Sequence, residues 1–252
     1  MIEVTDLHKS FGDNEVLKGI SATFKKGDTS MIIGTSGSGK TVFLKCLLGL
    51  FEPDSGEISY DGRIYSKMNL KEKRDLRKEM GMLFQGGALF DSETIEENIM
   101  FPLKMFTDQT KEEMLDRVNF VLNRVNLVNQ NKKYPAEISG GMQKRVAIAR
   151  AIVMKPKYLF CDEPNSGLDP KTAIVIDNLI QEITDEYEII TIINSHDMNS
   201  VMEIGEKIIF LKNGIKEWEG SKETIFKTNN EAVTDFVYSS DLFKKVREIY
   251  NR

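Results

Sequence analysis

One octapeptide constrains this chain more than any other feature. Residues 34–41 read Gly-Thr-Ser-Gly-Ser-Gly-Lys-Thr and fill the pattern G-x-x-x-x-G-K-[ST], a loop whose backbone N–H groups surround the phosphates of a nucleoside triphosphate. Glycines suit such a loop because a Cβ would obstruct the approach of the backbone to phosphate. An apolar run, Thr29–Ile33, precedes the loop, and a segment expected to be helical to about Leu50 follows it. Strand, loop and helix in this order predict a phosphate-binding loop.

The residue types predict separate roles within this loop. Lys40 is expected to place its charge near the β and γ phosphates, and Thr41 to offer its hydroxyl to Mg²⁺. The dipole of the following helix points its positive end at the anion. The predicted nucleotide-binding residues of the loop are Gly34, Thr35, Ser36, Gly37, Ser38, Gly39, Lys40 and Thr41.

A pair of carboxylates forms the second candidate site. The apolar run Tyr158–Cys161 ends in Asp162 and Glu163, and in a parallel α/β sheet ligands lie beyond the carboxyl ends of the strands. We predict that Asp162 holds the metal, directly or through water, and that Glu163 is the general base that polarises the attacking water. The alternative is a polar strand end before a proline-containing turn.

A second glycine-rich stretch, Ile-Ser-Gly-Gly-Met-Gln at residues 138–143, opens a helix predicted to run to about Met154. Ser139 can cap that helix, and the paired glycines admit another phosphate. A single nucleotide does not need two such loops. An arrangement in which this stretch faces the nucleotide of a second copy would use both.

Composition and charge narrow the class of protein. A chain of 252 residues that is 40% hydrophobic can bury a substantial core. The net charge of −5 and the scattered Lys and Arg do not form the basic patch of a nucleic-acid-binding protein. The sequence has neither an apolar run near the ~18 residues of a membrane span nor a signal peptide at its start, so we expect a cytoplasmic protein. Cys46 and Cys161 lie in apolar segments and are predicted to be reduced core residues.

The order of the apolar patterns predicts an α/β fold with a mixed sheet core. Residues 2–33 alternate as an antiparallel β layer does, and residues 58–64 read as a further hairpin. Residues 91–136 show helical periodicity, with one apolar stripe formed by Met114, Leu115, Val118, Val121, Leu122 and Val125. We interpret this part, extended to about residue 154, as an inserted helical subdomain. Strands and helices then alternate, which predicts a parallel sheet.

The motifs, in their order along the chain, resemble those of the ATP-binding cassette (ABC) family. Residues 34–41 are similar to the family's Walker A loop, Gln85 to its Q-loop glutamine, Ser139, Gly140, Gly141 and Met142 to its signature, Asp162 and Glu163 to its Walker B pair, residues 166–169, ending in Asp169, to its D-loop, and His196 to its switch histidine. The resemblance spans almost the whole chain. It implies a P-loop NTPase of the ABC type, with ATP and Mg²⁺ as ligands.

The resemblance also implies a head-to-tail homodimer in which ATP lies between the Walker A loop of one copy and the signature of the other. Phe11 would stack on adenine, and Gln85 would join Thr41 at Mg²⁺. Ser139 would touch the γ phosphate of the opposite copy, and His196 that of its own. Taken singly, Phe11 also fits a core position, Gln85 a solvated strand end, and His196 a structural histidine.

A finer resemblance lies around the Q-loop. Residues 81–91, Gly-Met-Leu-Phe-Gln-Gly-Gly-Ala-Leu-Phe-Asp, and 97–103, Glu-Asn-Ile-Met-Phe-Pro-Leu, look like the Mla and Mce type ATPases that drive phospholipid or related lipid transport in bacterial envelopes. Met142 replaces the usual glutamine, as in that subfamily. The departures from the family pattern, Ile138 for Leu and Asn165 for Thr, remove no catalytic group.

This subfamily implies an ATP-hydrolysing subunit at the cytoplasmic face of the inner membrane, with integral membrane permease subunits and a lipid-binding envelope subunit as partners. One alternative is a cassette that serves amino acids, metal ions or lipoprotein release, since such cassettes share the core motifs. The other is a soluble cassette for DNA repair, chromosome organisation or translation, which the acidic balance and the single short cassette disfavour.

Two further surfaces are predicted. The small residues 86–88 beside Leu89 and Phe90 suggest a groove for a helix of a membrane subunit, or else a turn packed on the helical insertion. We divide the chain into a cassette domain at 1–220 and a C-terminal helical extension at 221–252. The extension has an apolar face formed by Leu242, Phe243, Val246, Ile249 and Tyr250. Its own domain, the partner ATPase or a membrane surface would cover that face.

Overall fold

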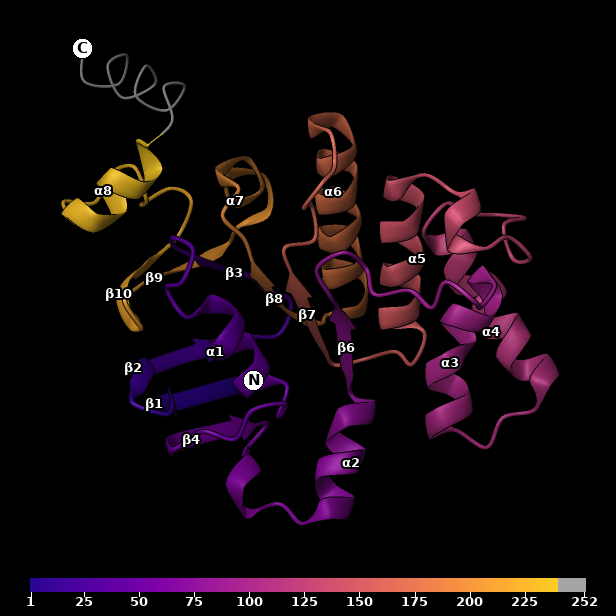
Figure 1. Cartoon of the computed structure of the whole chain (residues 1–252), viewed down its shortest axis with the longest axis horizontal. Coiled ribbons are helices and arrows are strands. Elements are labelled where there is room, and N and C mark those ends of the chain that lie inside the picture. The colour runs from indigo at the N-terminus through magenta and orange to yellow at the C-terminus, as the bar shows by residue number, and fades with distance from the viewer. Residues whose placement is uncertain (240–252) are drawn as a thin grey trace.

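The computed structural model describes residues 1–239 and arranges them as two sheets with helices around them (Figure 1). The strands are β1 Ile2–Phe11, β2 Asn14–Phe24, β3 Thr29–Ile33, β4 Ser55–Tyr60, β5 Arg63–Ile64, β6 Met80–Leu83, β7 Tyr158–Asp162, β8 Ile190–Asn194, β9 Lys207–Lys212 and β10 Ile215–Gly220. The helices are α1 Lys40–Leu47, α2 Leu70–Lys78, α3 Ile95–Phe106, α4 Lys111–Arg124, α5 Gly140–Ile152, α6 Pro170–Tyr187, α7 Met198–Ile204 and α8 Glu231–Val237.

A six-stranded sheet positions the candidate site. Its order is β10-β9-β3-β8-β7-β6, and only β10 runs antiparallel to its neighbour. Every residue of β3, β7 and β8 is buried, which explains their continuous apolar runs. Asn194 pairs with Ile32 on one side and with Asp162 on the other. The carboxyl ends of β3, β8 and β7 therefore lie together at one edge of the sheet.

The predicted antiparallel layer is confirmed as a four-stranded sheet of order β2-β1-β4-β5. It shares one hydrophobic cluster with α1, to which Leu17, Phe24 and Phe43 belong. Cys46 and Cys161 are both buried and free, as predicted. The two sheets thus enclose α1, the helix that follows the phosphate loop, and fix its direction.

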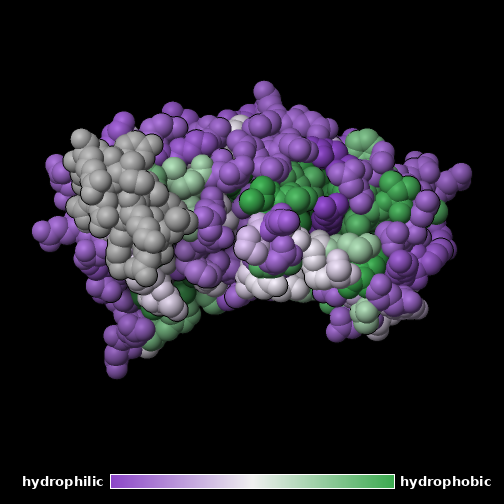
Figure 2. Space-filling model, turned by 90° about the horizontal axis from the view of Figure 1, so that it is seen from above, coloured by the Kyte–Doolittle hydropathy of each residue, from purple (hydrophilic) through white to green (hydrophobic). Residues whose placement is uncertain are grey.

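Helices α3, α4 and α5 form the predominantly helical part on the right of Figure 1. Within the predicted stripe, Val118, Val121, Leu122 and Val125 are buried, and Met114 and Leu115 pack against the same cluster. Seen from above, hydrophilic residues cover most of the rim, and hydrophobic ones gather in the centre and over this helical side (Figure 2). Among residues 1–239, no helix has the length and apolar character needed to cross a membrane.

Two helices end earlier than the sequence predicted. Helix α1 ends at Leu47 rather than near Leu50 because Gly49, with φ 64°, turns the chain. The Leu50 N–H bonds to the Lys45 carbonyl at 2.9 Å and the Gly49 N–H to the Cys46 carbonyl at 3.0 Å, which is a Schellman C-cap. Helix α5 ends at Ile152 instead of Met154.

Helix α8 lies within the predicted C-terminal extension, and its Phe236 ring packs on Phe210, with the ring centroids 5.3 Å apart. The predicted apolar face formed by Leu242, Phe243, Val246, Ile249 and Tyr250 falls outside the described residues.

Candidate nucleotide site

The phosphate loop needs glycine at positions that this chain itself defines. Gly34 has φ 148°, and a Cβ on it would lie 2.2 Å from the Leu211 carbonyl oxygen. Gly39 is the N-cap of α1 with φ 103°, and a Cβ there would lie 2.9 Å from Leu17 Cδ2. A side chain at position 34 would collide with the backbone of β9, and one at position 39 would press on the Leu17 side chain in a backbone conformation that favours glycine. The loop between β3 and α1 therefore has the close-packed backbone that a phosphate cradle requires.

Lys40 crosses this loop from the first turn of α1. Its side chain is buried, and Nζ donates to the carbonyl oxygens of Gly34 at 2.8 Å and Thr35 at 3.1 Å. Desolvation lowers the pKa of Lys40, and the charges of Glu163 and Asp162 partly oppose that effect. The Ser38 hydroxyl, also buried, has no partner among the described residues. A buried cation and an unpartnered hydroxyl are what a polyphosphate would satisfy.

Asp162 ends β7 and is buried. Its carboxylate accepts from Asn194 Nδ2 at 3.1 Å and, more weakly, from Thr41 Oγ1 at 3.4 Å. Carboxylate, hydroxyl and phosphate oxygens are the ligands that Mg²⁺ prefers, usually with several waters retained. The donor set at the end of β7 and the start of α1 therefore fits Mg²⁺ bound together with a nucleotide.

Glu163, the next residue, leaves the sheet with φ 49°, a left-handed conformation uncommon outside glycine. Its backbone N–H donates to the Asn194 carbonyl at 3.0 Å. Both of its carboxylate oxygens lie 2.9 Å from His196 Nδ1, so His196 donates to Glu163 when Nδ1 carries the proton. The ends of β7 and β8 thus bring the predicted base and the predicted switch histidine into direct contact.

One cavity of about 630 Å³ joins the phosphate loop, Glu163 and His196, whereas the buried Asp162 is not part of its lining. It is lined by Val16, residues 34–42, Gln85, Glu163, His196 and Phe236. Gln85 follows β6 and is exposed, so its amide is available to a ligand in the cavity. The phosphate loop, Gln85, Glu163 and His196, which the sequence analysis placed at one site, therefore share one open space.

Other predicted residues lie outside this cavity lining. Phe11 is 45% exposed with its ring centroid 5.2 Å from that of Phe51, which excludes the core alternative. Ser139 caps α5 by accepting the Met142 N–H at 3.3 Å, and Asp169 caps α6. Gly140, Gly141 and Met142 form the first turn of α5. One chain therefore does not bring its signature to its own phosphate loop.

Three contributors escaped the sequence analysis. Val16 and Phe236 line the cavity from β2 and α8, and no local pattern marks either residue as part of a site. Asn194 supports both Asp162 and Glu163. Its place directly after the apolar run Ile189–Ile193 was the available signal, since polar residues at strand ends in this sheet face the site.

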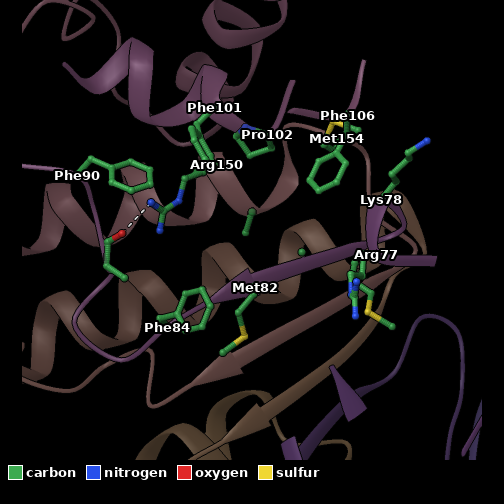
Figure 3. A pocket seen from close by; sticks show the side chains of 14 residues that line it. Arg77, Lys78, Met82, Phe84, Phe90, Phe101, Pro102, Phe106, Arg150 and Met154 are labelled. Atoms are coloured by element: carbon green, nitrogen blue, oxygen red, sulfur yellow. Dashed lines mark hydrogen bonds between the residues drawn. The ribbon is translucent and has the colours of Figure 1, made fainter. Parts of the chain in front are cut away.

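A second, smaller cavity of about 270 Å³ lies between β6 and α3 (Figure 3). Phe84 and Met82 form one side of it, and Phe101 and Pro102 the other. We call this cavity the aromatic groove. Its aromatic walls are exposed, with Phe84 at 39% and Phe101 at 44%.

Arg150 of α5 orders one edge of the aromatic groove. Its guanidinium donates to the carbonyl oxygens of Gly87 at 2.6 Å and Ala88 at 2.8 Å, where Ala88 has φ 47°. Leu89 packs against the helical core cluster, whereas Ala88 and Phe90 line the groove. Residues 86–90 therefore form a turn that packs on the helical part and also borders an open apolar surface; docking of a membrane-subunit helix there stays a prediction.

Comparison with known proteins identifies relatives of this chain by sequence. A family model described as "ABC transporter" matches residues 17–166. The methionine import ATP-binding protein MetN of Clostridium tetani is 43% identical over 84% of this chain and 66% of its own length. The probable ribonucleotide transport ATP-binding protein mkl of Mycobacterium tuberculosis (strain ATCC 25618 / H37Rv) is 37% identical over 94% of this chain and 66% of its own. The chain thus spans about two thirds of these relatives.

Solved structures agree with this result. The dimeric structure of MJ0796, described as a bacterial ABC transporter cassette, has a TM-score of 0.80 at 31% identity and covers 88% of this chain and 99% of its own. The cbiO1 protein of Clostridium perfringens is part of the ABC transporter complex cbiONQ. Its structure has a TM-score of 0.84 at 28% identity and covers 100% of this chain and 98% of its own. Both the sequence family and the fold lead to one assignment: this chain belongs to the ABC transporter family and has the fold of its ATPase cassettes.

Proposed function

We propose that this chain is the ATP-hydrolysing subunit of a bacterial ABC transporter and that it works as a homodimer on separate membrane subunits. The observation that carries the proposal is the contact between Glu163 and His196 on the same cavity as the phosphate loop. A carboxylate held beside a phosphate site is placed to accept a proton from an attacking water.

In this reaction the phosphate loop and Lys40 bind the triphosphate and offset its charge. Bound Mg²⁺ would supply further charge neutralisation, held by Thr41, Asp162 and Gln85. Water attacks the γ phosphorus, its proton passes to a Glu163 carboxylate oxygen, and the bond from phosphorus to the bridging oxygen breaks to leave ADP. His196 Nδ1 keeps the Glu163 carboxylate oriented while the proton moves.

The separation of the two glycine-rich segments supports the proposed dimer. Ser139 and the first turn of α5 lie outside the cavity lined by their own phosphate loop. A head-to-tail second copy would place its α5 N-terminus, with its free N–H groups, against the γ phosphate. The related MJ0796 cassette is described as dimeric, which supports this arrangement.

The aromatic groove is the proposed docking site for a helix of a membrane permease subunit. Exposed aromatic walls such as Phe84 and Phe101 suit the apolar face of a helix. Such docking would hold the cassette at the cytoplasmic face of the membrane and transmit closure of the dimer to the permease.

For the cargo we propose phospholipid or a related lipid, delivered with a lipid-binding envelope subunit. Support comes from the Q-loop residues 81–91 and from Met142, which resemble lipid-transport cassettes. A small solute such as an amino acid is the second candidate, favoured by the 43% identity to a methionine import protein and the 36% identity to a nopaline permease protein of Agrobacterium fabrum. Lipoprotein release is a further alternative.

The general-base assignment is tested with Glu163→Gln. Glutamine cannot take the proton, so we expect hydrolysis to fall by about 10²–10⁴-fold while ATP binding persists. Phosphate release and binding of a fluorescent ATP analogue measure the two effects. Glu112→Gln, on the exposed face of α4, is the matched control and should behave as the unchanged protein. Normal turnover by Glu163→Gln would rule out the assignment.

The cargo is tested with the same variant, which should hold ATP and the closed complex. Tagged Glu163→Gln is recovered from native membranes in detergent with ATP, and co-purifying proteins and lipids are identified by mass spectrometry. A permease with a lipid-binding subunit and enriched phospholipid supports lipid transport. A permease with a solute-binding partner supports the second candidate, and soluble or nucleic-acid partners alone would overturn the transport assignment.

A further inference from the structure

A buried polar cluster lies behind the catalytic pair. Asp177 of α6 is 2% exposed, and its Oδ1 accepts from Asn165 Nδ2 at 2.7 Å. The same Asn165 Nδ2 donates to Ser200 Oγ of α7 at 3.0 Å, and Ser200, also buried, lies near enough to the Asp177 carboxylate to oppose the rise in its pKa. Three side chains from three separate elements therefore meet in one closed triangle.

Each corner of the triangle is close in sequence to a residue of the proposed reaction. Asn165 follows Glu163 by two residues, within a turn closed by the Ser166 N–H on the Glu163 carbonyl at 3.2 Å. Ser200 lies in α7, which starts directly after His196 and the capping Asp197. Helices α6 and α7 pack against each other (Figure 1). The triangle thus links the segment after β7, which carries Glu163, to the segment that leads into α7, which carries His196.

An apolar residue would pack at position 177 without the penalty of burying a carboxyl group. Desolvation raises the pKa of Asp177 to about 6, so at neutral pH the fold carries an ionised carboxylate at a cost in stability. Glu163, moreover, holds a left-handed backbone with φ 49°. Such conformations persist only where the surroundings over-determine them.

We propose that Asp177 is a positioning residue for ATP hydrolysis: through Asn165 and Ser200 it holds Glu163 and His196 in the relative position that the reaction needs. The inference rests on the proposed function for its consequence in catalysis. Its structural part, the placement of His196 against Glu163, stands on the contacts alone.

The test replaces Asp177 by Leu, which has a similar shape and no hydrogen-bonding groups. We expect kcat for ATP hydrolysis to fall about tenfold or more, with KM for ATP within about twofold because the phosphate loop is untouched. Asp177→Asn, in contrast, should keep kcat near the wild-type value, since the asparagine carbonyl can accept from Asn165 and its amide can donate to Ser200. Ser200→Ala, a smaller change, gives a partial loss and serves if the leucine variant does not fold.

Thr184→Val is the matched control on the same helix. Thr184 Oγ1 is also buried and bonds to the Ile180 carbonyl at 2.9 Å and to Thr191 Oγ1 at 2.6 Å, but it does not contact Asn165 or Ser200. We expect this variant to lose thermal stability and to keep kcat. Equal losses of kcat in Thr184→Val and Asp177→Leu would overturn the proposal, because a general loosening of α6 would then explain both.

A second readout does not depend on hydrolysis. The chain has 2 histidines, so an imidazole NMR spectrum compared with that of His8→Gln assigns the His196 signal. Asp177→Leu, or Ser200→Ala in its place, should shift that signal, and Thr184→Val should leave it unchanged. An unmoved His196 signal, or a wild-type kcat, in the Asp177→Leu protein overturns the proposal. Should Glu163→Gln retain full hydrolysis while the His196 signal still moves, the base assignment fails and the positioning role stands.

Discussion

Lys144 carries a buried charge on α5, five residues after Ser139. Its side chain is 5% exposed, and Nζ has no hydrogen-bond partner among residues 1–239. Desolvation lowers the pKa of Lys144, while Cys161 and Glu163 act in the opposite direction. An ammonium group in this position costs free energy of folding because its lost hydration is not replaced.

Lys144→Met should therefore raise the free energy of unfolding at neutral pH by about 1–3 kcal/mol. Because the folded-state pKa lies below the unfolded value of 10.5, the native state binds fewer protons in that interval and its stability rises with pH. The gain from Lys144→Met is then largest below the lowered pKa and shrinks as the pH rises toward 10.5. Urea denaturation across pH measures it, with the exposed Lys104→Met as control. A loss of stability at neutral pH would contradict the reasoning.

Single residues also show where prediction from sequence succeeds. Lys40 and Thr41 lie where the contiguous pattern placed them, after a strand and at the start of a helix, and both line the cavity; their roles at phosphate and Mg²⁺ stay predictions. Asp177 and Ser200 were not identified, since neither belongs to a local motif and their polar partners come from other elements. Phe236 reaches the nucleotide cavity only through the packing of α8 on β9, which no periodicity reports.

At the scale of elements, helix starts coincide with candidate functional residues. Asp169, the last residue of the predicted D-loop, caps α6 by accepting the N–H groups of Lys171 and Thr172, both at 3.1 Å. Hydrogen bonds to Thr172 and the α6 backbone lower the pKa of Asp169 and so favour its charged form. The first turn of α6 therefore fixes the position of the Asp169 carboxylate within the single chain.

Asp169→Ala should lower the free energy of unfolding, because the N-cap side chain that accepts from the first turn of α6 is lost. Asp169→Asn should keep most of that stability because asparagine caps nearly as well. Denaturant titration measures both variants against the wild type, and the loss in the alanine variant should shrink below the pKa of Asp169, where the wild-type carboxyl is neutral and caps α6 more weakly. Equal losses for alanine and asparagine would assign the effect to the charge instead of the cap.

Some strands and helices were predicted from the sequence, and others were not. Strands β3, β7 and β8 were predicted within one residue or so because their apolar runs are continuous. Neither α2 nor β6 was predicted. Helix α2 is almost wholly polar, with Leu76 as its one buried residue, and β6 has the sequence Met-Gly-Met-Leu, with a glycine that disfavours strands. Strand β6 forms because β7 is available for pairing. Helix α2 instead starts at a local capping box between Asn69 and Glu72, a signal that the sequence analysis missed.

At the scale of the whole molecule, the phosphate loop and the predicted signature lie apart. The phosphate loop follows β3 near the centre of the six-stranded sheet, whereas the N-terminus of α5 lies beyond β7 and α6 (Figure 1). Within α5, Gly141 abuts α6, since a Cβ there would lie 2.7 Å from Thr172 Cγ2. The first turn of α5 therefore packs closely against α6, away from the phosphate loop of the same chain.

This separation has a genetic consequence. In the proposed head-to-tail dimer, Lys40→Ala would disable the phosphate loop of a site and Ser139→Ala its signature. A dimer that contains one copy of each would then have one site with both defects and one site with neither. Equal mixtures of the two inactive proteins should regain about a quarter of wild-type ATPase activity if subunits exchange and sites act independently. Activity assays on the co-expressed pair measure this recovery, and a mixture as inactive as its parts would argue against shared sites. In a cell, two defective alleles of one gene would then complement each other, a phenotype usually reserved for mutations in different genes.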